Sequence, residues 1–264
     1  MDFRLDTPHL RIYSARPLPF ARQTAAILES EYGAYVRDHH IFWKLKELGA
    51  PVKVFLFRDR VSFEKNGGPL CPFMSSDTMG FYLTATQTLY VGCSANPHDP
   101  DGGILTNAAH EMTHALDDLL AGMAPALDSH PWVREGRAEY WGLSLSNRRI
   151  LPGAAVFSAR TREPDIVAQA VPAPDLAALV SMDSTAYMKA GFRNYALSWA
   201  LVHFLLHGEQ GRHAEGFKRY LTKLQEKPEE ANLEACLGVR VADLEVPFKV
   251  YAQKVLLPSV QRSK

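Results

Sequence analysis

The sequence predicts an α+β fold, with a mixed α/β amino-terminal lobe that holds a small sheet and a helical carboxy-terminal lobe. The β-rich runs stop near residue 92, and after Glu163 the pattern is almost entirely helical. The chain has 264 residues, of which 47% are hydrophobic, so it can bury a substantial core. Because no linker is visible, we expect a single domain over residues 1–264, with lobes of about 1–122 and 123–264.

The amino-terminal lobe shows short strand patterns around one long helical segment. Residues 2–14 alternate like a strand, residues 18–47 are helical in pattern, and residues 51–57 form a short buried strand. Residues 80–84 and 88–92 are β-rich and are separated by three residues, which predicts a hairpin. One strand of this hairpin is expected at an edge of the sheet.

A further helix is predicted over residues 105–120. Its start follows the turn signal Asp101-Gly102-Gly103, with Thr106 as a candidate cap, and Gly122 and Pro125 provide its stop. Apolar residues recur at helical spacing and predict one amphipathic helix with a stripe that faces the core. They are Leu105, Ala109, Met112, Leu116, Leu119 and Leu120.

This helix carries His110-Glu111-Met112-Thr113-His114, an H-E-x-x-H pattern. Histidines at i and i+4 share a helix face, so both imidazoles can bind one zinc ion. Glu111 lies beside them and can act on a water molecule as a general base. Nearby His98, Asp99 and Asp101 lack the spacing of a calcium loop, and Pro100 interrupts them, so we interpret them as an ordinary loop.

A catalytic zinc site needs a third protein ligand, and the next predicted helix offers two candidates. This helix spans residues 131–141, with Pro131 in its first turn and Ser129 as the expected cap. Glu135 and Glu139 are four residues apart and therefore share one face. Only one of them need bind, and the spacing permits either.

The two helices together resemble those of the gluzincins, the peptidase-MA-like zinc metallopeptidases in which a glutamate on the next helix follows H-E-x-x-H. The segment from Arg134 to Tyr140 is similar to the N-E-G-F-A-type motif of the aminopeptidase branch, which implies Glu135 as the ligand. The resemblance also implies that Glu139 holds a histidine ligand in place. Over residues 1–210 the order of elements resembles compact bacterial members of uncharacterised function. It implies a zincin-like fold with the zinc cleft between the lobes.

The implied reaction is hydrolysis of a peptide bond. Zinc would lower the pKa of a bound water, and Glu111 would take the proton of that water and pass it to the leaving amine. The same resemblance implies that Tyr195 stabilises the oxyanion, with packing at the rim of a core helix as its alternative role. Tyr187, His203 and Arg193 are weaker candidates.

The hairpin offers residues 89–92 as a strand to which an extended peptide or protein substrate could add. The G-x-M-E-N-type motif that binds a free amino terminus in aminopeptidases is missing, which favours an endopeptidase. The alternative is a zincin-like domain that binds zinc or a partner without turnover. Arg134 and Arg137 flank Glu135, and they either alter substrate choice at the site or lie on a solvated helix face.

Composition narrows the partners and the compartment. Lys plus Arg equals Asp plus Glu at 29 each, so we expect no binding to nucleic acid or to an anionic membrane surface. The sequence has neither an apparent signal segment nor a membrane span. Three scattered cysteines agree with a reducing compartment. We therefore expect a cytoplasmic protein, with secretion the alternative if a signal segment precedes Met1.

Overall fold

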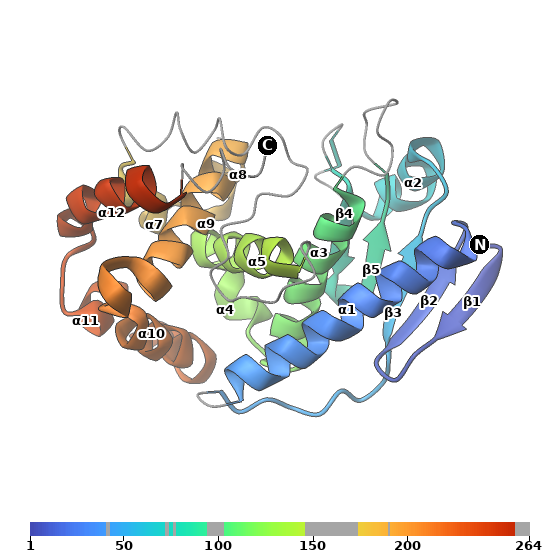
Figure 1. Ribbon diagram of the computed structural model, residues 1–264, viewed down its shortest axis with the longest axis horizontal. Helices are drawn as coiled ribbons and strands as arrows, with labels where there is room; N and C mark the ends of the chain where they lie inside the picture. The colour runs from blue at the N-terminus through green and yellow to red at the C-terminus, as the bar shows by residue number, and fades with distance from the viewer. Residues whose placement is uncertain are drawn as a thin grey trace. The chain divides into compact units, whose positions relative to one another are not determined.

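The computed structural model describes residues 1–40, 43–71, 74–75, 78–93, 103–145, 174–189 and 191–256, with the side chains of 142–145 left out. The chain divides into two compact units, Met1–Ala121 and Gly122–Lys264. Every described strand lies in the first unit, and the described elements of the second unit are helical (Figure 1). The predicted α+β class is confirmed.

The first unit contains a five-stranded sheet in the order β1-β2-β3-β5-β4. The inner pairs β2-β3 and β3-β5 are parallel, and the outer pairs β1-β2 and β5-β4 are antiparallel. The strands are β1 (Phe3–Asp6), β2 (Leu10–Ser14), β3 (Val52–Leu56), β4 (Gly80–Leu83) and β5 (Thr88–Val91). The predicted strand over residues 2–14 is therefore two strands, because the chain turns after Asp6 and the Thr7 N–H donates to the Leu10 carbonyl.

The two faces of the sheet differ in composition, as alternation along each strand requires. One face carries buried aliphatic residues that include Leu10, Ile12, Val54 and Leu89. The other face carries four half-buried aromatic rings that stack across neighbouring strands with centroids 4.8 to 5.5 Å apart. This aromatic row consists of Tyr13, Phe55, Tyr90 and Phe81.

Three helices complete the first unit, namely α1 (Leu18–His39), α2 (Arg60–Gly67) and α3 (Ile104–Leu119). Helix α1 ends earlier than the predicted residue 47. Beyond it Trp43 stacks on His39, with ring centroids 4.7 Å apart. Helix α2 was not predicted, although Asp59 and Ser62 form a reciprocal capping box at its start. The predicted hairpin is confirmed as β4 and β5, which a short 3-10 turn at Thr84–Thr86 connects.

The second unit is built around the packing of two long helices, α5 on α9. The predicted helices near residues 213–225 and 242–257 are confirmed by α10 and by α12 with its flanking turns, whereas α11 was not predicted. The helices are α4 (Ala124–Asp128), α5 (Pro131–Leu145), α7 (Leu176–Ser181), α8 (Ser184–Lys189), α9 (Phe192–His207), α10 (Ala214–Glu226), α11 (Leu233–Leu237) and α12 (Glu245–Tyr251). The pattern predicted from Glu163 to Pro172 lies outside the described residues.

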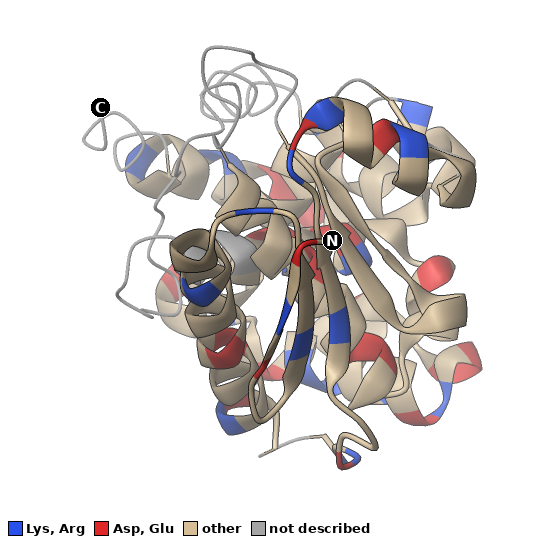
Figure 2. Ribbon diagram, turned by 90° about the vertical axis from the view of Figure 1, so that its right-hand side faces the viewer, with Lys and Arg blue, Asp and Glu red and all other residues tan. Residues whose placement is uncertain are grey.

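Two further observations bear on partners. Within the described ranges, no helix combines the length and the apolar character needed to cross a membrane. Acidic and basic residues are interspersed along the ribbon in the view of Figure 2, which agrees with their equal numbers in the sequence.

Candidate functional site

Helix α3 starts and stops close to the predicted positions, but its start differs in detail. The residue before it is Gly103, with φ 73°, and no side chain caps the helix. Thr106 is a buried residue inside the helix, so its predicted capping role is wrong. The stop is confirmed, because Gly122 adopts a positive φ of 66° just after the helix. Pro125 then lies in the first turn of α4.

The predicted apolar stripe of α3 is buried at Ala109, Met112, Leu116 and Leu120, but the other faces of the helix are largely buried as well. From Ile104 to Asp117 every residue except Leu105 is buried, including the polar ones. Within the first unit α3 contacts α1 on one side and strands β4 and β5 on another. A helix whose polar groups are buried on several sides must satisfy them within the protein, and this makes its polar contacts informative.

His110 and His114 lie next to each other on α3, as the i, i+4 spacing predicts. Their Nε2 atoms are 3.1 Å apart, and their rings meet edge to face at a centroid distance of 4.8 Å. Both side chains are buried, with residue exposures of 6% and 8%. The two histidines thus direct the same ring nitrogen toward one point, as two ligands of one metal ion would.

Glu111 points toward the edge of the sheet. Its Oε2 accepts a hydrogen bond of 2.9 Å from the backbone N–H of Tyr82 on β4. The Tyr82 side chain returns to α3, where its hydroxyl donates to Asp118 at 2.7 Å. Nothing in the sequence indicated this arrangement, because a backbone N–H leaves no residue-specific signal.

Helix α1 holds α3 through two buried hydrogen bonds one turn apart. The Thr113 hydroxyl donates to Glu31 at 2.6 Å, and the Tyr35 hydroxyl donates to Asp117 at 2.6 Å. Burial raises the pKa of Glu31 well above its usual range, and Asp117 adds to this, against the opposing effects of Thr113 and His110. We refer to these two bonds as the α1–α3 ladder.

On α5, Glu135 is buried, with 7% of its surface exposed. Its neighbour Gly136 lies where α5 meets α9, and a Cβ at this position would lie 2.6 Å from the backbone oxygen of Ser198. Glycine is therefore required here by close approach of two helices. The Arg134 Nε lies 3.5 Å from Glu135 Oε1, while its terminal nitrogen binds Asp128 at 2.9 Å.

Three of the predicted site residues form one group. One ligand atom each from His110, His114 and Glu135 lies within 4.8 Å of the others, and such a group could hold a metal ion. Glu139, the alternative ligand, does not belong to this group. The choice of Glu135 over Glu139 as a metal ligand stays a prediction.

The surroundings of Glu135 differ in part from those predicted. Glu139 is buried, with 3% exposure, and so is Arg137, with 2%. The alternative of a solvated helix face is therefore wrong for Arg137. Arg134 is partly exposed and pairs with the exposed Asp128. The expected cap of α5 is wrong as well, because Ser129 ends α4 and His130 precedes Pro131.

The two candidate tyrosines, Tyr187 and Tyr195, occupy different environments. Tyr187 is fully buried and donates its hydroxyl to Ser198 at 2.9 Å. Burial raises its pKa well above the usual range, with a further contribution from the charge of Glu135. Tyr195 is partly exposed, and its hydroxyl contacts the Met188 sulfur at 3.5 Å. The Tyr187 and Tyr195 rings pack together with centroids 5.6 Å apart.

The other two weaker candidates both lie on α9. His203 is buried, and its Nδ1 is 2.7 Å from the Tyr251 hydroxyl. Arg193 is exposed at the start of α9. Neither placement assigns a role in catalysis, and the role of Tyr195 stays a prediction.

The predicted substrate strand needs correction. Residues 89–92 include β5, which pairs with β3 on one side and β4 on the other and therefore has no open edge. The edge strand of the hairpin is β4 (Gly80–Leu83). It contacts α3 directly and provides the Tyr82 N–H to Glu111. The prediction failed because strand order depends on long-range pairing.

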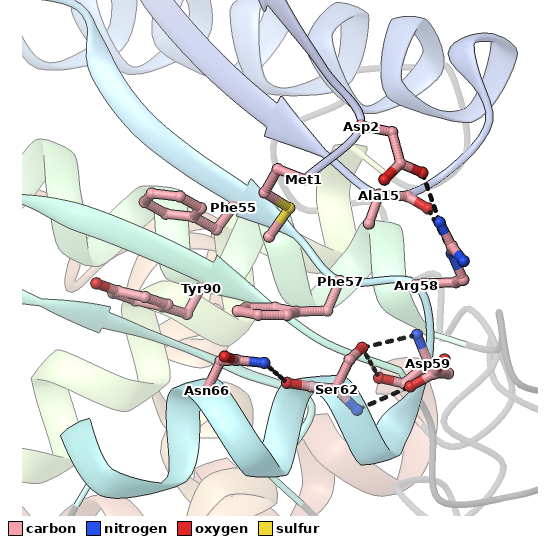
Figure 3. A pocket seen from close by; sticks show the side chains of 10 residues that line it. All are labelled: Met1, Asp2, Ala15, Phe55, Phe57, Arg58, Asp59, Ser62, Asn66 and Tyr90. Carbon is pink, nitrogen blue, oxygen red and sulfur yellow. Dashed lines mark hydrogen bonds and ion pairs between the residues drawn. The ribbon is translucent and has the colours of Figure 1, made fainter.

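A cavity of about 430 Å³ lies elsewhere in the first unit. Phe55, Phe57 and Tyr90 form an aromatic wall, and Arg58 binds Asp2 at 2.6 Å at its rim (Figure 3). Phe55 and Tyr90 belong to the aromatic row, on the sheet face that does not carry the buried aliphatic residues. None of the predicted site residues lines this cavity. The loop residues His98, Asp99 and Asp101 lie outside the described residues.

A comparison with models of known protein families finds no match for this chain, and a comparison with curated proteins finds none either. The resemblance to gluzincins therefore stays a prediction that rests on the motif residues.

Proposed function

We propose that this chain is a zinc-dependent metallopeptidase with a zincin-like fold. His110, His114 and Glu135 hold the zinc ion, and Glu111 acts as the general base. The observation that carries the proposal is the grouping of these three ligand atoms within 4.8 Å, with Glu111 in the same helical turn as the histidines. The H-E-x-x-H pattern and its resemblance to gluzincins support the same conclusion.

The donor set suits zinc in number and type, and the two histidines also suit it in spacing. Two imidazoles and a carboxylate are a common set for a catalytic zinc, which keeps a further position open for water. In a tetrahedral site with zinc–nitrogen bonds of about 2.0–2.1 Å, two ligand atoms lie about 3.3 Å apart. The two Nε2 atoms are separated by 3.1 Å, which is close to this value.

Zinc bound at this site would supply Lewis acidity, which lowers the pKa of a water molecule and polarises a carbonyl group. Glu111 then takes the proton from the water and passes it to the leaving amine. The Tyr82 N–H holds one carboxylate oxygen of Glu111 at 2.9 Å. This bond limits rotation of the carboxylate.

The substrate is a peptide or protein that lies along β4. An edge strand can accept an extended chain through backbone hydrogen bonds, and β4 provides both this edge and the contact to Glu111. Because the sequence lacks the motif that binds a free amino terminus, we favour an endopeptidase. Tyr195 remains the proposed oxyanion donor by resemblance, and the alternative is Tyr187, whose ring packs on that of Tyr195 at a centroid distance of 5.6 Å.

One observation favours a domain that binds without turnover. Arg134 lies 3.5 Å from Glu135 and can compete with a metal ion for its carboxylate. In that case Glu135 would be retained as an ion-pair partner, and the protein would act through partner binding.

The test measures zinc and hydrolysis together in the full chain. We expect one zinc per chain in the wild type and cleavage of a peptide library. Glu111→Gln should retain zinc and lose hydrolysis by at least about a hundredfold, because it removes the base and keeps the shape. Glu64→Gln on α2 is the matched control, since Glu64 is exposed and pairs with Arg60 one turn away on the same helix. A wild type that takes up no zinc would refute the metallopeptidase. Zinc uptake without cleavage would favour the binding domain.

A further inference from the structure

Tyr82 contacts helix α3 at two points that are two turns apart. Its backbone N–H donates to Glu111 at 2.9 Å, and its hydroxyl donates to Asp118 at 2.7 Å. Glu111 and Asp118 are at i and i+7, so they lie on the same face of the helix. One residue of the edge strand therefore bridges this face of α3.

The register of the hairpin explains why Tyr82 can do this. The Gly92 N–H donates to the Met79 carbonyl, and Phe81 pairs with Tyr90 in the same register. In an antiparallel ladder, alternate residues direct their backbone groups toward the partner strand. The backbone groups of Gly80 and Tyr82 therefore point away from β5, toward the open edge. The hydrogen bond from Tyr82 to Glu111 agrees with this direction.

Close approach of the strand to α3 is also visible at Gly80. A Cβ at this position would lie 2.4 Å from Asn107 Nδ2 on α3, so only glycine fits without displacement. At Gly80 the absence of a side chain lets β4 contact α3 closely. At Tyr82 two hydrogen bonds hold the strand on the helix. Burial raises the pKa of Tyr82, and the bond to Asp118 raises it further, so the hydroxyl remains a donor.

We propose that Tyr82 is a positioning residue that fixes β4 on α3. The bond between its hydroxyl and Asp118 keeps the strand where the Tyr82 N–H reaches Glu111, and so orients that carboxylate. This inference rests on the proposed function for its catalytic consequence, but the positioning itself does not require zinc. An extended substrate at this edge could not bond to the Tyr82 N–H, because Glu111 already accepts from it.

The direct test is hydrogen exchange of the amide of residue 82 in the full chain, measured by NMR. Glu111→Ala removes the acceptor and gives the rate of the unbound amide. We expect Tyr82→Phe to raise the exchange rate at least about tenfold toward that rate. Tyr90→Phe is the matched control, because it makes the same change on the paired strand, on the face with the aromatic row. Asp118→Asn keeps an acceptor for the Tyr82 hydroxyl, so the amide of residue 82 should exchange more slowly in this variant than in Asp118→Ala.

Kinetics on a cleaved peptide give the second measurement. We expect Tyr82→Phe to lower kcat about tenfold with KM and zinc content near wild type, since a misplaced base affects the chemical step. Unchanged exchange at residue 82 would refute the positioning role. Faster exchange with unchanged kcat would also refute it, because Glu111 would then not depend on the bond. If the wild type cleaves no peptide, the proposed function fails, and the exchange rates alone decide whether Tyr82 fixes the strand.

Discussion

Gly136→Ala is the substitution whose effect can be worked out most fully from the structure. A Cβ at residue 136 would lie 2.6 Å from the Ser198 backbone oxygen, 2.8 Å from its carbonyl carbon and 3.0 Å from its Cβ. Two carbon atoms at their best separation are about 3.5–4.0 Å apart, so α5 and α9 would have to separate by roughly 1 Å. The contacted atoms include backbone of a helix, which no side-chain rotation can relieve.

Two opposing effects set the magnitude. Forcing an extra methyl group into a packed contact costs about 1–3 kcal/mol. Alanine is better than glycine in a helix by about 1 kcal/mol. Taking the middle of the first range, we expect a net loss of about 1 kcal/mol in the free energy of unfolding. Gly33→Ala on α1 is the matched control, because a Cβ there meets nothing within 4 Å. This control should gain about 0.4–1 kcal/mol.

The assay is urea unfolding followed by far-ultraviolet circular dichroism and by tryptophan fluorescence. Trp132 and Trp141 lie on α5 and Trp199 lies on α9, so fluorescence reports on the helices that the substitution affects. With an m-value of about 2 kcal/mol/M, the midpoint for Gly136→Ala should fall by about 0.5 M. A midpoint equal to or above that of wild type would refute the argument from close approach. An equal fall for Gly33→Ala would show that the cost does not come from the α5–α9 contact.

The remaining predictions concern the metal ligand and one surface carboxylate. Glu135→Ala should lose zinc after a mild chelator wash that Glu139→Ala withstands, and the reverse order would exchange their roles. Burial acts to raise the pKa of Glu29, but hydrogen bonds from Thr7 and His9 lower it below 4.5 overall. The stability that Glu29 contributes is thus present above pH 4.5 and is lost as the pH falls through the lowered pKa. Glu29→Gln should therefore lower the urea midpoint at about pH 7 and change it little at about pH 3, whereas equal shifts would contradict this linkage.

Local sequence patterns predicted the histidine pair, the hairpin and the helix around Glu135, because neighbouring residues determine each of these features. The spacing of His110 and His114 determines that they share a helix face, and the resulting pair is present. The hairpin of β4 and β5 and the helix around Glu135 follow from equally local signals. The choice between Glu135 and Glu139 came from resemblance, because helical spacing treats them alike.

The features that were missed depend on contacts between segments far apart in the sequence. Strand order places β4 at the edge, and no pattern within residues 80–92 contains that information. The burial of Thr113 and Asp117 on α3 was also missed, because their hydrogen-bond partners lie on α1, far away in the sequence. The role of Gly136 depends on the distance between two helices, which the sequence does not state.

The α1–α3 ladder has a consequence for how His110 and His114 would bind a zinc ion. Glu31 and Tyr35 are one turn apart on α1, and Thr113 and Asp117 are one turn apart on α3. Hydrogen bonds therefore join the two helices at two successive turns. A rotation of α3 by a single residue would break both bonds and leave buried polar groups without partners. The imidazoles are therefore preorganised by the protein, and under the proposed function a zinc ion would have little conformational entropy to overcome. In zinc fingers, by contrast, the metal orders the fold itself.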